Sequence, residues 1–243
     1  TVTGTGSHPR RELLRKGPHI SAINPTFAAI GGRDIAPTPR LRGAIHAGVV
    51  PLVAATGIAL IVLAPSLEAR LAAALYAVCA LTLFATSATH HLNRWGERAG
   101  GAVRRFDHAG IFLIIAGTYT PYVVLGLEGA TRAIVLGAVW AAALAGVGLK
   151  LVNAPTPRWL SVALYIALGW MAALVFPQLL AGVGVPSIVL ALVGGGLYSI
   201  GAIVYATKRP NPFPRTLGFH EVFHLFTVAA FASLDVGVWL VLH

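Results

Sequence analysis

The chain has 243 residues, 56% of them hydrophobic and only 11% charged, and its formal net charge is +10. Soluble globular domains carry about 25% charged residues, so this composition excludes an ordinary soluble enzyme and a disordered chain and indicates an integral membrane protein. The single cysteine, Cys79, excludes both an intrachain disulfide and a zinc site built on cysteines. Nucleic acid is not an expected partner, because the basic residues lie in short gaps between apolar segments.

Seven apolar segments are long enough to cross a bilayer as helices, which takes about 20 residues each. In chain order they are 43–64, 69–91, 107–127, 131–152, 159–179, 186–207 and 217–242. Several of the gaps between them carry the glycine and proline residues that are typical of turns. The sequence therefore predicts an all-α integral membrane protein, a seven-transmembrane helix bundle over residues 43–243, preceded by a polar, basic arm at 1–42.

The distribution of lysine and arginine predicts the orientation of this bundle. Of the 18 basic residues, all but Arg70 and Arg132 lie in the arm or in the second, fourth and sixth gaps, on one side of the membrane. Basic residues concentrate on the cytoplasmic side. We therefore expect a cytoplasmic N-terminus, an external C-terminus and a multi-pass protein of the plasma membrane. The arginine-rich, alanine- and glycine-rich composition favours a bacterial source.

The last apolar segment opens with a histidine motif, His220-Glu221-Val222-Phe223-His224. His220 and His224 are four residues apart and share one helix face, so both imidazoles can bind one metal ion, and H-E-x-x-H is the zincin signature. The alternative is two interfacial histidines that bond water or lipid head groups. An intramembrane protease is not favoured, because Asp235 lies too far beyond His224 to complete its metal site.

Two further segments bring polar residues to the same leaflet. Ser87 and His91 share a face at the end of the second segment, and Asp107 begins the third. A catalytic zinc has three protein ligands and one open position, which His91, His220 and His224 can provide. Ser87 and Asp107 then lie beside the metal. Asp107 can also cap its helix, and Ser87 can bond a carbonyl of its own helix.

The remaining histidines have weaker patterns. His90 lies 100° around the helix from His91 and is expected to face elsewhere, although it is the alternative ligand because helix ends fray. His108 and His46 are expected at the membrane interface.

Three motifs follow one another along the chain: Ser87-x3-His91, Arg105-Phe106-Asp107-His108 leading to Ala116-Gly117-Thr118-Tyr119-Thr120-Pro121, and His220-Glu221-Val222-Phe223-His224. Over about residues 40–243 the chain resembles the progesterone and adipoQ receptor family, whose bacterial branch is called hemolysin III. The resemblance implies a seven-helix fold with a zinc ion near the inner leaflet, held by His91, His220 and His224 with Ser87 and Asp107 nearby. It also implies kinship with membrane hydrolases that include alkaline ceramidases. Glu221 departs from the adiponectin receptors, which carry glutamine there.

The predicted function is a zinc-dependent hydrolase of ceramide-like lipid amides or esters at the inner leaflet. Asp107 is the first candidate for the general base and Glu221 the second, with Ser87 nearby. The alternative is a non-catalytic sensor or receptor of membrane lipid or fluidity with a structural zinc. A channel or cytolysin is less favoured, because a pore needs polar faces along several helices and segments 131–207 are almost wholly apolar. In each case the expected partner is a membrane lipid or fatty acid.

Overall fold

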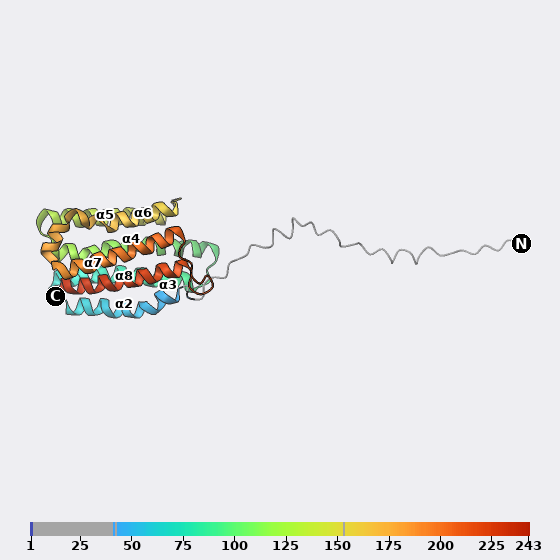
Figure 1. Cartoon of the computed structure of the whole chain (residues 1–243), viewed down its shortest axis with the longest axis horizontal. Coiled ribbons are helices and arrows are strands. Elements are labelled where there is room, and N and C mark those ends of the chain that lie inside the picture. Colours follow the sequence, from blue (N-terminus) through green and yellow to red (C-terminus); the bar gives the residue numbers. More distant parts are fainter. Residues whose placement is uncertain (2–40, 42, 153) are drawn as a thin grey trace. The chain divides into compact units, whose positions relative to one another are not determined.

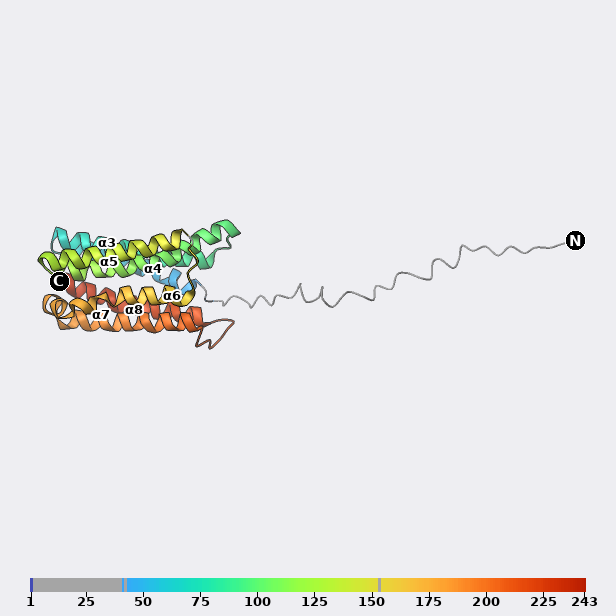
Figure 2. The ribbon, with the colours of Figure 1, turned by 90° about the horizontal axis from the view of Figure 1, so that it is seen from above.

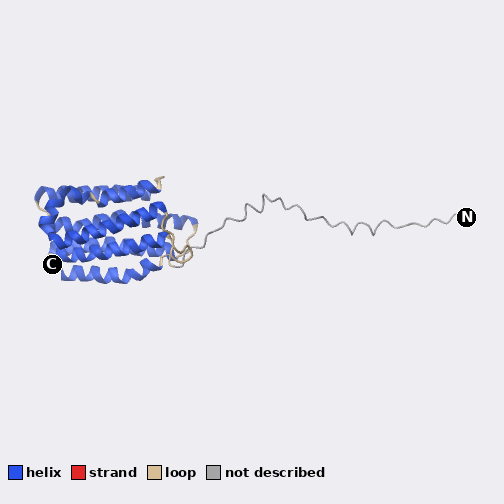
Figure 3. Ribbon diagram, in the orientation of Figure 1, coloured by secondary structure: helices blue, strands red, loops and turns tan. Residues whose placement is uncertain are grey.

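The computed structural model describes residues 1, 41, 43–152 and 154–243, and these residues form helices joined by short loops (Figures 1 and 3). In chain order the elements are α2 (Ala44–Leu63), α3 (Leu67–Leu92), α4 (Glu97–Gly126), α5 (Gly129–Leu151), α6 (Arg158–Gly169), the 3-10 segment η1 (Met171–Val175), α7 (Phe176–Thr207) and α8 (Phe219–Leu242). The predicted arm at 1–42 lies outside the described residues, Thr1 and Leu41 excepted. The all-α prediction is confirmed for the described part of the chain.

Six helical runs among the described residues are long and apolar enough to cross a membrane. Five of them match predicted segments and are α2, α3, α4, α5 and α8. The predicted segments 159–179 and 186–207 both fall within one run of 50 residues, Arg158–Thr207. This run is interrupted by η1 and by Gly184, whose φ of 79° and ψ of 164° are not helical. Glycine adopts positive φ at no steric cost, and Pro186 close behind it lacks the N–H that would continue a helical ladder.

The start of α4 differs from the prediction. The helix begins at Glu97 instead of 107, because residues 97–106 are helical but too polar to belong to an apolar segment. Asp107 therefore lies about three turns inside α4. The interpretation of Asp107 as the N-cap of its helix is wrong, because Gly96 occupies the N-cap position of α4.

Helix α4 is the central helix of the bundle. In its most apolar stretch 72% of the residues are buried, against 22% in α2 and in α5. It packs against α3 and α5 and also contacts α6, α7 and α8, and α2 and α5 lie toward opposite edges of the bundle in Figure 1. Close packing against α3 depends on Gly117, where a Cβ atom would lie 2.6 Å from the Cβ of Cys79. Figure 2 shows α7 and α8 side by side, as their contacts require.

Candidate metal centre

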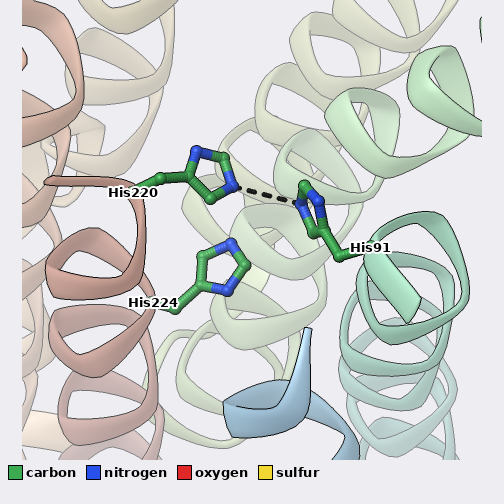
Figure 4. Close-up of side chains that lie close together, drawn as sticks. All are labelled: His91, His220 and His224. Atoms are coloured by element: carbon green, nitrogen blue, oxygen red, sulfur yellow. Dashed lines mark hydrogen bonds between the residues drawn. The ribbon is translucent and has the colours of Figure 1, made fainter. Parts of the chain in front are cut away.

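Three histidines from two helices meet at one end of the bundle (Figure 4). His91 lies in the last turn of α3, whereas His220 and His224 lie in the first two turns of α8. The Nε2 atoms of His91 and His220 are 3.1 Å apart. One ring nitrogen of each histidine lies within 4.8 Å of the other two. The structure thus brings together the three residues that the sequence proposed as ligands.

The separation of the ring nitrogens fits a shared metal ion. Two imidazole nitrogens bound to one tetrahedral zinc, each at about 2.0–2.1 Å, lie about 3.3 Å apart. The 3.1 Å between His91 and His220 is close to this value. Neutral imidazole is also a preferred ligand of zinc. The three side chains therefore fit a three-histidine metal site in both chemistry and spacing.

Asp107 adjoins this triad from α4. Its Oδ2 atom lies 2.8 Å from His90 Nδ1 and 3.7 Å from His91 Nε2. His90, His91 and Asp107 form a second group that is compact enough to hold a metal ion. The expectation that His90 faces elsewhere is wrong: its ring centroid is 4.4 Å from that of His91, and both side chains reach the same carboxylate. Two consecutive residues of α3 thus lie beside one carboxylate of α4.

The two acids proposed as general base have different surroundings. Asp107 and Ser87 line a cavity together with His220 and His224. Glu221 is fully buried, and its Oε2 atom accepts a hydrogen bond of 2.9 Å from the Gly218 N–H. Glu221 is not among the described residues that line the cavity. Its carboxylate thus stabilises the start of α8, whereas Asp107 faces the space that a substrate would enter.

His46 belongs to the site although the sequence placed it at the membrane interface. It lies in the first turn of α2, is 2% exposed, and stacks on His224 with ring centroids 3.9 Å apart and planes 8° from parallel. The edge of Phe84 packs against it at 5.0 Å. Neither ring nitrogen of His46 has a hydrogen-bond partner among the described residues. The available signal was a histidine inside an apolar segment, which marks a functional position by default.

Comparison with known proteins gives the family. A family model described as Haemolysin-III related matches residues 35–234. The chain belongs to this family. It is 33% identical to a hemolysin-3 homolog of Bacillus subtilis (strain 168) over 128 residues, which cover 53% of this chain and 57% of the relative. It is 32% identical to hemolysin-3 of Bacillus cereus over 128 residues, which cover 53% and 56% of the two chains. The chain thus spans about half the length of the curated relatives it matches, and the predicted resemblance to the hemolysin III branch is confirmed.

In this Haemolysin-III related chain, a cavity of about 850 Å³ extends from the candidate metal centre into the bundle. Its polar end holds Ser87, Asp107, His220 and His224. The rest of its wall is mostly aliphatic and aromatic and includes Ile111, Ile114, Ile115, Ile166, Phe176, Leu179, Ile188 and Leu192. Ligand pockets have volumes of about 300–1,000 Å³ and mostly apolar walls with a few polar groups. The cavity therefore has the size and polarity of a site for an amphipathic ligand.

Proposed function

We propose that this protein is a zinc-dependent hydrolase of lipid amides or esters, such as ceramide-like lipids. The observation that carries the proposal is the position of His220, His224 and Asp107 at the polar end of a large, mostly apolar cavity, with His91 grouped beside the two histidines. An acyl chain fits the apolar part, and the bond to be cleaved then lies at the polar end.

The side chains of the site suggest their roles. His91, His220 and His224 would hold the metal ion. When bound, zinc supplies Lewis-acid polarisation of a carbonyl and a water of lowered pKa. Asp107 is placed to accept a proton from the attacking water, and the His90 N–H donates to Oδ2 of the same carboxylate at 2.8 Å and keeps it oriented. Ser87 is one turn from His91 on α3 and is placed to donate a hydrogen bond to the polar group of the lipid.

We also propose seven membrane crossings, with the site in the inner leaflet of the plasma membrane. The run Arg158–Thr207 has 50 residues and would be about 75 Å long as one helix, whereas the hydrocarbon core is about 30 Å thick. Two crossings with a turn near the break at Gly184 accommodate this length. The uneven distribution of basic residues supports a cytoplasmic N-terminus and an external C-terminus.

Fatty-acid release by the purified full-length chain tests the proposal. Ceramide and phospholipid are supplied in detergent micelles, and the products are measured by mass spectrometry. We expect turnover that is lost on chelation, restored by zinc, and lost in Asp107→Asn. The matched control is Asp235→Asn, because Asp235 is also an acid within the bundle but bonds Tyr76 and lies about 16 Å along α8 from His224.

The same assay tests the alternative function. A chain that binds zinc and lipid but releases no fatty acid would contradict the hydrolase and favour a non-catalytic lipid sensor with a structural metal.

A further inference from the structure

Four basic side chains line the same end of the cavity as the triad. They are Arg104 and Arg105 of α4, Lys150 at the end of α5 and Arg158 at the start of α6, and we call them the cationic mouth. Within the described part of the chain, none of the four forms an ion pair with a carboxylate. Asp107 is the one acid among the described residues of the cavity wall, and it is engaged by His90. The mouth therefore has a surplus of positive charge.

Lys150 differs in burial from most lysines near the ends of membrane helices. Lysines near the ends of membrane helices usually extend their ammonium groups into water, and lysine is seldom buried unless paired. Lys150 is 8% exposed, and its Nζ donates to Ser161 Oγ at 2.6 Å and to Thr156 Oγ1 at 2.9 Å, both side chains of the cavity wall. An ammonium has three N–H donors. Two neutral hydroxyls leave its charge uncompensated and one donor available for a ligand.

Aromatic contacts connect the mouth to the triad. The guanidinium carbon of Arg158 lies 4.9 Å from the centroid of the Tyr205 ring. The Tyr205 ring is in turn 5.8 Å from the ring of His220. The Tyr165 hydroxyl donates to the backbone carbonyl of His108 at 3.1 Å and so ties α6 to α4 beside the mouth. A ligand anchored by Arg158 would therefore lie next to the candidate metal centre.

We propose that the cationic mouth binds the phosphate of a lipid head group while the hydrocarbon chain occupies the apolar part of the cavity. Arginine and lysine are the usual partners of phosphate. A phosphate monoester carries a charge of about −1.5 to −2 at pH 7, which matches the surplus charge better than a neutral amide or ester does. The proposal rests on the proposed function where it treats this lipid as the substrate. Binding of the phosphate by the cationic mouth does not depend on hydrolysis.

The experiment compares two lipids that differ only by a phosphate. Binding of oleoyl lysophosphatidic acid and of monooleoylglycerol to the full-length chain in detergent is measured at equilibrium, and fatty-acid release is followed in the same samples. We expect the phosphate-bearing lipid to bind at least about tenfold more tightly, as one charge-assisted contact provides. Inorganic phosphate at the same concentration should not compete, because it lacks the hydrocarbon chain.

Variants assign the preference to the mouth. Lys150→Gln should weaken binding of the phosphate-bearing lipid by about tenfold and leave monooleoylglycerol unaffected, and Lys150→Arg should retain the preference. Arg158→Gln, at an exposed position, should lower the preference without disturbing buried packing. The matched control is Lys208→Gln, an exposed lysine between α7 and α8 that is not among the described cavity residues.

Equal affinities for the two lipids, equal losses in Lys150→Gln and Lys208→Gln, or full competition by inorganic phosphate would overturn the proposal. A phosphate preference without fatty-acid release would support the mouth and contradict the hydrolase. Release of fatty acid from neutral lipid without any phosphate preference would support the hydrolase and contradict the mouth.

Discussion

Replacement of His46 tests whether the stack on His224 orients a metal ligand. The two rings are nearly parallel, with centroids 3.9 Å apart, and Phe84 also packs against His46 in an edge-to-face contact. His46 is 2% exposed and supplies no nitrogen to the groups of described residues that could hold a metal. We therefore expect His46 to act by positioning the His224 ring.

The stack of His46 on His224 determines how much the affinity for zinc should change when His46 is replaced. An aromatic pair contributes about 0.5–1.5 kcal/mol beyond the area it buries, and 1.4 kcal/mol corresponds to a tenfold change in an equilibrium constant. If the stack is lost, His46→Ala should raise the dissociation constant for zinc by about 2- to 12-fold. His46→Phe should stay within about twofold of wild type, because a phenyl ring keeps the stack and the imidazole nitrogens bond to no described residue.

Competition between the purified chain and a zinc-binding dye measures these constants. The control is His243→Ala, since His243 lies at the far end of α8, exposed, beside the Trp239 and Leu63 carbonyls. If His46→Phe lost zinc as severely as His46→Ala, the nitrogens of His46 would be required and the stacking explanation would be refuted.

Three further predictions concern orientation, ligand choice and the general base. A reporter that is active only outside the cytoplasm should be active when fused after His243 and silent when inserted at Gly96, and the reverse pattern would contradict the proposed topology. His90→Ala should leave most of the bound zinc in place, as elemental analysis would show, because the His90 Nδ1 atom bonds the carboxylate of Asp107 and His90 is not part of the group His91, His220 and His224. Asp107→Asn should keep zinc and lower the rate of lipid hydrolysis by about 10²- to 10⁴-fold, whereas Glu221→Gln should retain activity; the opposite result in a turnover assay would make Glu221 the base.

Hydropathy was sufficient to predict most of the helices. The long apolar segments predicted α2, α3, α5 and α8, with predicted ends close to the observed ones. The same property could not give the start of α4, because its first three turns extend past the apolar residues and contain charged ones. The division of the run Arg158–Thr207 was instead indicated by glycine and proline, because Gly184 and Pro186 lie at the boundary between the two predicted segments and Gly184 interrupts the helix.

The candidate site was predictable only where its residues share a helix. His220 and His224 are one turn apart, so the helical period alone places them together. The contacts of His46 and His90 depend on how α2 and α4 are rotated against their neighbours, and apolar composition does not determine that rotation. The cationic mouth could not be predicted from the sequence for a similar reason. Its four residues come from three helices, and in the sequence they are part of a general excess of positive charge on one side of the predicted bundle.

The metal content of the purified chain tests whether His91, His220 and His224 hold a metal ion. Elemental analysis should give about one zinc per wild-type chain and almost none for His224→Ala, with the two proteins matched in yield and helix content. A folded wild-type chain that takes up no zinc on dialysis against zinc, or a His224→Ala chain that retains the full amount, would show that the three histidines do not hold the metal.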